Sequence, residues 1–203
     1  MNVPRCRVII ISFNKYQETT GPSLLSLKQD PTNIEIIVVD NFDKLDNAIH
    51  ILSKANIVGF DTETKPAFKK GVINEVALLQ LSVKDIAFLF RINRIGLPKE
   101  VCKILANPKI IKPGVAINDD IKALNKVQPF KPKGVVELQE NAKTLGIINF
   151  SLKNLASITC GFRISKGQQL SNWEADVLSE AQKRYAATDA WAALEIYENI
   201  SRN

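Results

Sequence analysis

Two apolar runs that lie close together constrain the fold of this chain more than any other feature of its sequence. Val76–Ser82 and Ile86–Phe90 have the composition of β-strands, and Lys84 and Asp85 between them predict a tight hairpin. A third apolar run, residues 57–60, precedes them. Beyond residue 92, short strand-like runs alternate with helical patterns. The chain is therefore predicted to be an α/β protein with a mixed sheet flanked by helices.

The size and composition of the chain are those of one ordinary globular protein. It has 203 residues, of which 45% are hydrophobic and 24% are charged. No apolar run approaches the roughly 20 residues that span a bilayer, and residues 8–11 are too few for the core of a signal peptide. We therefore expect no membrane partner and a cytoplasmic location.

The scarcity of histidine and cysteine limits the kind of metal site that the chain can build. His50 is its only histidine, and its three cysteines are widely spaced, so neither a zinc site nor a disulfide framework is expected. A bound metal should have oxygen ligands, which favours Mg²⁺ or Mn²⁺. The net charge of +6 suits a phosphate-rich partner, although many basic proteins bind nothing acidic.

Two carboxylates follow the apolar run 57–60. Asp61 and Glu63 are at positions i and i+2, so on a strand their side chains share one face. Neighbouring carboxylates repel one another unless a cation lies between them. The alternative is a solvated strand end with two surface acids.

A second pair of acids, Asp119 and Asp120, lies where a short strand leads into a helix. Aspartate is favoured at a helix start, so capping is an alternative to metal binding. One of the two could cap the helix while the other points into a site.

A third candidate, Tyr185 with Asp189, lies on the long helix expected from Ser179 to about Ile200. The two side chains are at i and i+4 and therefore share a helix face, although a surface Asp beside a half-buried Tyr is an alternative. A two-metal site needs several carboxylates from different elements, which these segments supply. A tyrosine hydroxyl could orient the attacking water.

The order of these segments resembles that of the DEDDy 3′→5′ exonucleases, a family that includes ribonuclease D, the Werner-type exonucleases and the proofreading domain of DNA polymerase I. The resemblance covers about residues 43–200 and extends beyond the acids. It is carried by Val58-Gly59-Phe60-Asp61-Thr62-Glu63, Leu78-Leu79-Gln80-Leu81-Ser82, Ser151-Leu152-Lys153-Asn154-Leu155-Ala156, Leu170-Ser171-Asn172-Trp173-Glu174 and Tyr185-Ala186-Ala187-Thr188-Asp189.

The resemblance implies a ribonuclease H-like fold and two divalent metal ions, Mg²⁺ or Mn²⁺. The implied ligands are Asp61, Glu63, Asp120 and Asp189, and Tyr185 would position the nucleophilic water. The spacing from Gly114-Val115 favours Asp120 over Asp119. The implied contacts to the substrate come from Thr62, Thr64, Arg163 and Lys166, of which the last two could equally belong to an ordinary solvated loop.

The N-terminal segment is unlike an exonuclease. Residues 7–41 resemble the opening β-α-β unit of family 2 glycosyltransferases, with Asp40 at the position that helps to bind the nucleotide in that family. The rest of that domain is absent. Alternatively, residues 34–39 could form an edge strand of the exonuclease sheet. We accordingly predict an N-terminal extension over residues 1–41 and an exonuclease domain over residues 42–203.

The function predicted from the sequence is hydrolysis of phosphodiester bonds from a free 3′ end of DNA or RNA, releasing nucleoside 5′-monophosphates. A non-catalytic nucleic-acid-binding module on the same fold is the main alternative. Binding of a nucleotide-sugar by the N-terminal segment is a further one.

Overall fold

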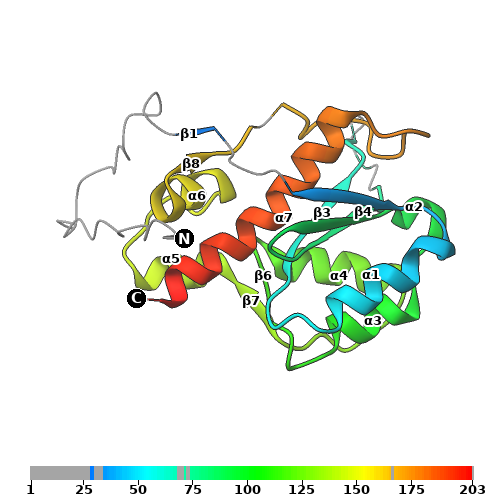
Figure 1. The fold of residues 1–203 in the computed structure, drawn as a ribbon. Coiled ribbons are helices and arrows are strands. Elements are labelled where there is room, and N and C mark those ends of the chain that lie inside the picture. The colour runs from blue at the N-terminus through cyan, green and yellow to red at the C-terminus, as the bar shows by residue number, and fades with distance from the viewer. Residues whose placement is uncertain (1–27, 30–33, 68–70, 72–73, 166, 203) are drawn as a thin grey trace.

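A four-stranded mixed sheet lies at the centre of the protein (Figure 1). The structure is a computed structural model that describes residues 28–29, 34–67, 71, 74–165 and 167–202. The strands are β2 (Glu35–Val39), β5 (Ile86–Phe90), β4 (Val76–Ser82) and β3 (Gly59–Thr64), in that order across the sheet. β3, β4 and β5 are antiparallel, whereas β2 is parallel to β5, so the predicted mixed sheet is confirmed.

Two short parallel strands continue this architecture beyond β3. They are β6 (Lys112–Gly114) and β7 (Val135–Glu137), and a parallel bridge between Ile57 and Ile111 joins them to the chain that leads into β3. A separate two-residue pair, β1 (Lys28–Gln29) with β8 (Phe162–Arg163), lies outside the main sheet.

Helices on one face of the sheet enclose the larger part of the core. α1 (Leu45–Leu52), α3 (Lys99–Leu105) and α4 (Ile117–Val127) contribute to one apolar cluster with alternate residues of the strands. Two short elements, the 3₁₀ helix η1 (Phe42–Lys44) and the helix α2 (Ile92–Ile95), connect the strands to them. The strand residues of this cluster include Phe60, Leu79, Leu81, Phe88 and Phe90.

One long helix, α7 (Glu180–Ser201), crosses the opposite face of the sheet (Figure 1). Ser179 caps it, and the side chain of Gln182 accepts a hydrogen bond from the Ser179 N–H, completing a capping box. α5 (Leu138–Thr144) and α6 (Leu152–Cys160) pack against the C-terminal half of this helix in a second cluster.

Glycine and alanine residues bring α7 unusually close to β3. A Cβ atom at Gly59 would lie 1.9 Å from the Ala190 carbonyl oxygen, so no larger residue fits there without movement of the helix. Ala186, Ala187 and Ala190 are all fully buried, which keeps the contact surface of the helix flat. The elements that carry the predicted acids therefore meet through backbone rather than through long side chains.

Only part of the predicted N-terminal extension, residues 1–41, is described by the structure. Residues 7–27 lie outside the described residues. Glu35–Val39 forms β2 and pairs with β5 over its whole length, which is the edge-strand arrangement considered from the sequence. Asp40 follows this strand and pairs with Lys44 at 2.9 Å.

Two local features concern helix capping. Asn41 caps the first turn of the 3₁₀ helix by accepting a hydrogen bond from the Lys44 N–H. The Ser171–Glu174 segment has the spacing of a capping box but forms a turn, in which the Glu174 N–H donates to the Asn172 side chain. Trp173 is fully buried, so packing of its ring takes precedence over helix formation.

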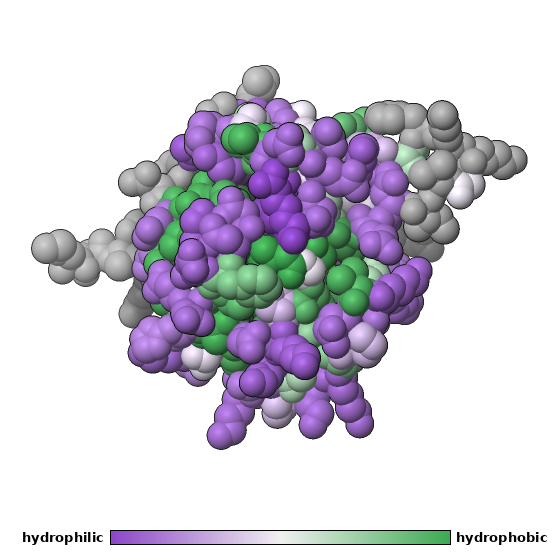
Figure 2. Space-filling model, turned by 90° about the vertical axis from the view of Figure 1, so that its right-hand side faces the viewer, coloured by the Kyte–Doolittle hydropathy of each residue, from purple (hydrophilic) through white to green (hydrophobic). Residues whose placement is uncertain are grey.

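Polar side chains cover much of the face shown in Figure 2, with apolar residues grouped near its centre. Among the helices of the described chain, none has the length and apolar character needed to cross a membrane.

The contact at Gly59 predicts that the variant Gly59→Ala is severely destabilised. The added methyl group must displace the backbone of α7, so we expect a loss of about 3 kcal/mol or more in the free energy of unfolding. Urea denaturation followed by circular dichroism measures this. Gly167→Ala is the control, because a Cβ atom there lies at an ordinary 3.4 Å from the nearest atom, the Ser165 hydroxyl. Equal stability of the two variants would contradict the prediction.

Candidate active site

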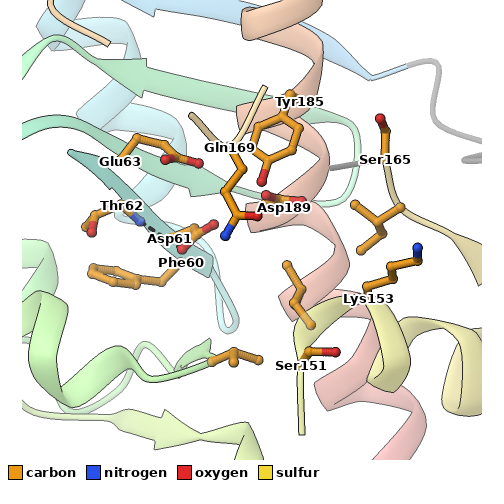
Figure 3. A pocket seen from close by; sticks show the side chains of 13 residues that line it. Phe60, Asp61, Thr62, Glu63, Ser151, Lys153, Ser165, Gln169, Tyr185 and Asp189 are labelled. Carbon is orange, nitrogen blue, oxygen red and sulfur yellow. Dashed lines mark hydrogen bonds between the residues drawn. The ribbon is translucent and has the colours of Figure 1, made fainter. Parts of the chain in front are cut away.

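Three carboxylates from β3 and α7 converge at the end of the sheet. Asp61 and Glu63 lie on the face of β3 that Gly59 presents to α7, while Phe60, between Gly59 and Asp61, enters the core on the opposite face. Each of Asp61, Glu63 and Asp189 offers an oxygen atom, and these three atoms lie within 4.8 Å of one another. Figure 3 shows Asp61 and Glu63 on the strand facing Asp189 on the helix. The structure thus brings Asp189 to the pair Asp61 and Glu63, which is far from it in the sequence.

A fourth acid, Asp120, is tied to this group through β3. Its side chain accepts a hydrogen bond of 2.7 Å from the Thr62 hydroxyl. Its charge also contributes to raising the pKa values of both Asp61 and Glu63. Its neighbour Asp119 points away into solvent, where it forms an ion pair of 2.7 Å with Lys122. The two adjacent acids therefore have different environments, and only Asp120 faces the cluster.

The start of α4 is built to aim Asp120 at β3. Ala116 precedes the helix in a left-handed conformation, with a φ of 56°, which turns the chain sharply between β6 and the helix. The backbone N–H of Ala116 donates to the Glu137 carboxylate at 3.0 Å. This tertiary contact holds the turn, since no side chain caps α4.

Burial and mutual repulsion raise the pKa values of the clustered acids. Desolvation is the largest cause in each case. It raises the pKa of Asp61 well above its usual range, with added repulsion from Asp189, Glu63 and Asp120. The pKa of Glu63 rises to about 8 for the same reasons. That of Asp120 rises to about 6, because burial outweighs its hydrogen bond from Thr62.

Tyr185 lies one helical turn before Asp189 and above the carboxylates (Figure 3). Its ring packs against Trp173 with the centroids 6.0 Å apart. Burial, the nearby carboxylates and a hydrogen bond to Asp189 all raise the pKa of the phenol far above its usual value. The hydroxyl therefore keeps its proton at neutral pH. It can orient a water molecule, but it is poorly suited to take a proton from one.

The donor set fits a hard divalent cation. All the clustered ligand atoms are carboxylate oxygens, the type that Mg²⁺ and Mn²⁺ prefer. The acids destabilise one another when ionised, and a bound cation reverses that effect by attracting the same charges. This balance of charge makes a metal-binding role more consistent with the geometry than a solvated strand end.

Two cavities adjoin one another, and the carboxylates line the first of them. The first has a volume of about 270 Å³ and contains Asp61, Glu63, Asp189 and Tyr185. The second has a volume of about 580 Å³. Both are lined by Lys153, Ile164, Ser165 and Tyr185, so they form one continuous depression that leads away from the acids.

Basic residues line the second cavity. Arg163, from the predicted substrate-binding set, lies there with Lys153 and Arg184. Gln169 lines the first cavity and points toward the carboxylates in Figure 3. Three of these residues, Lys153, Gln169 and Arg184, were not predicted as site residues from the sequence. They come from α6, a loop and the outer side of α7, and no local spacing in the sequence relates them.

The remaining predicted substrate contacts have different positions. Thr62 is part-buried and its hydroxyl donates to Asp120, so it supports an acid of the site. Thr64 is exposed at the end of β3, beyond a bulge in the pairing with β4. Lys166 lies outside the described residues.

Comparisons with known proteins agree on one family. The family model described as 3′-5′ exonuclease matches residues 36–203. The bifunctional 3′-5′ exonuclease/ATP-dependent helicase WRN of Mus musculus is 36% identical over 155 residues, which is 73% of this chain and 11% of that protein. A 3′-5′ exonuclease of Arabidopsis thaliana is 31% identical over 147 residues, covering 70% of this chain and 51% of that one.

A solved structure supports the same conclusion. The crystal structure of the Aedes aegypti Nibbler EXO domain superposes with a TM-score of 0.75 at 26% sequence identity, covering 87% of this chain and 90% of that one. The chain thus spans nearly all of an isolated domain but only 11% and 51% of the two full-length relatives.

The raised pKa values predict how the stability of the metal-free protein depends on pH. The pKa of Glu63 is about 8 in the folded protein against 4.5 for the unperturbed group, so the folded state holds more protons between these values. The free energy of unfolding should therefore fall as pH rises from about 5 to 8. Mn²⁺ should raise the melting temperature most at pH 8, where the acids are most ionised.

Thermal denaturation in EDTA and in Mn²⁺ across this range measures both effects. The matched variant Glu63→Gln carries no titrating group at this position, so its melting temperature in EDTA should fall less steeply with pH. Identical slopes for the wild type and the variant would contradict the prediction.

Proposed function

The chain belongs to the 3′-5′ exonuclease family, in its DEDDy type, and from this membership we propose that it hydrolyses phosphodiester bonds from the 3′ end of a nucleic acid, releasing nucleoside 5′-monophosphates. The observation that carries the proposal is the convergence of Asp61, Glu63 and Asp189 to within 4.8 Å. The link from Thr62 to Asp120 adds the fourth acid of the family pattern.

In this proposal Asp61, Glu63, Asp120 and Asp189 hold two divalent ions, Mg²⁺ or Mn²⁺. When bound, such ions activate the attacking water and stabilise the charge on the phosphate and the leaving oxygen. The protein's own contribution is to fix the four carboxylates on rigid elements. β3 positions two of them, and α4 and α7 position one each.

Tyr185 acts on the nucleophile by orientation. Its hydroxyl remains protonated and donates to Asp189, so its oxygen can accept a hydrogen bond from a water molecule and hold that water in place. The packing of its ring against Trp173 restricts the direction of the hydroxyl. A phenol held in one direction orders the water before the reaction. Less orientational entropy is then lost at the reaction step.

The basic cavity beside the carboxylates offers a path for the substrate strand. Lys153, Arg163 and Arg184 line it, and the phosphates of a single strand need such charges along its backbone. The cavity meets the carboxylates at Tyr185, so a strand in this path would present its terminal phosphodiester bond to the acids. We assign Thr62 and Thr64 to the region of the terminal nucleotide, and the basic loop residue Lys166 to the strand.

The first test compares two adjacent aspartates. In Mn²⁺, the wild type should shorten a 5′-labelled oligonucleotide stepwise, and a block at its 3′ end should prevent this. Asp120→Asn should lower kcat by about 100-fold, the size of loss typical when one charge-stabilising group is removed. Asp119→Asn should leave kcat within about twofold, because Asp119 pairs with Lys122 in solvent.

The same assay distinguishes catalysis from binding alone. Cleavage that survives in the double variant Asp61→Ala, Asp189→Ala would contradict the proposal. Salt-sensitive binding of the oligonucleotide by the wild type without any shortening would favour a non-catalytic module. Parallel DNA and RNA oligonucleotides identify the substrate class.

The second test concerns the strand path. Arg163→Ala and Arg184→Ala should each weaken binding of a single-stranded oligonucleotide in EDTA. Each should also make the negative slope of the logarithm of the binding constant against the logarithm of the salt concentration shallower by about 0.7, the value for one phosphate contact. Fluorescence anisotropy at several NaCl concentrations measures the slope. Lys54→Ala is the control, since Lys54 is exposed in the loop before β3. A slope change in the control equal to that in the arginine variants would rule out this path.

A further inference from the structure

Gln80 is a buried polar residue whose side chain has no partner in the described part of the chain. It lies in the middle of β4 with none of its surface exposed. Neither its Oε1 nor its Nε2 atom has a hydrogen-bond partner among the described residues. Burying an amide without a hydrogen-bond partner lowers the stability of the folded state, so such a residue needs an explanation.

The position of Gln80 relates it directly to the carboxylates. In the antiparallel pairing of β3 with β4, Gln80 lies opposite Asp61. Side chains of directly opposed residues point to the same face, with Cβ atoms about 5 Å apart. The amide of Gln80 and the carboxylate of Asp61 are therefore cross-strand neighbours on the face covered by α7.

Packing alone does not call for an amide at this position. On this face of the sheet the side chain of Gln80 is flanked by Leu78 on its own strand and by Leu89 on β5, which both belong to the apolar cluster beneath α7. A leucine at position 80 would fill similar space without leaving two polar atoms unpaired. The cost of the amide is thus more readily explained by the site beside it than by the core around it.

We propose that Gln80 is a positioning residue that holds Asp61 in its metal-binding orientation; this inference rests on the function proposed above. The Asp61 carboxylate accepts a hydrogen bond of 2.9 Å from the Thr62 N–H and has further lone pairs that can accept hydrogen bonds. The Nε2 group of Gln80 is a neutral donor at the strand position directly opposite Asp61. It stabilises the ionised form that binds a cation without adding a competing positive charge.

The test is the variant Gln80→Leu. Its melting temperature should equal or exceed that of the wild type, because two unpaired polar atoms are removed from the core. Its affinity for Mn²⁺, measured by calorimetry without substrate, should fall by about tenfold, as is typical for loss of a group that orients a metal ligand. In the nuclease assay kcat should fall by a similar factor, while KM for the oligonucleotide stays unchanged.

Ser82→Ala is the matched control in the same strand. Ser82 is also fully buried and lies opposite Gly59, and its hydroxyl donates to the Val83 carbonyl at 2.9 Å. Removing that hydroxyl should lower the melting temperature and leave the affinity for Mn²⁺ unchanged. Gln80→Met, which keeps the unbranched shape of the side chain, is tested beside Gln80→Leu in case branching disturbs the packing.

Each outcome decides the inference. Wild-type affinity for Mn²⁺ in both Gln80 variants overturns it, as does a melting temperature several degrees lower in both, since that would make Gln80 a structural residue. Failure of the wild-type protein to bind Mn²⁺ or to cleave would instead refute the proposed function, and the inference with it.

Discussion

The contact between Gly59 and Ala190 is the constraint on which the site depends. Because a glycine on β3 faces a helix carbonyl, the axis of α7 lies close against the strand. Asp61 is two residues further along the strand and Asp189 is next to Ala190 on the helix. The carboxylates of Asp61 and Asp189 therefore lie close together. A larger residue at position 59 would separate the two elements and with them the acids.

This arrangement concentrates negative charge at buried positions, where ionised carboxylates are destabilised. Desolvation and repulsion raise the pKa values of Asp61, Glu63 and Asp120, so the metal-free protein carries an electrostatic penalty at neutral pH. The rest of the fold must offset it. Two apolar clusters on α7 and a capping box at its first turn hold the helix in place against that repulsion.

The features that the sequence predicted are those that follow from local periodicity. Alternation on β3 placed Asp61 and Glu63 on one face, and the helical repeat placed Tyr185 one turn from Asp189. The hairpin of β4 and β5 followed from two apolar runs with a polar pair between them. Lys153, Gln169 and Arg184 could not be found this way, because tertiary packing alone brings α6, the following loop and α7 around one cavity. Likewise, a capping pattern at Ser171 gave way to the burial of Trp173.

Lys112 shows how this fold treats a buried polar group whose role is structural. Its side chain is fully buried, and its Nζ atom donates to the carbonyl groups of Asn107 and Ile110, both at 2.7 Å. It thereby fastens the loop between α3 and β6 with good hydrogen bonds. Gln80 is equally buried and has no such partners among the described residues. The same chain thus provides hydrogen-bond partners for a buried ammonium group. The unpaired amide of Gln80 beside Asp61 is therefore better explained by a role in the site than by poor packing.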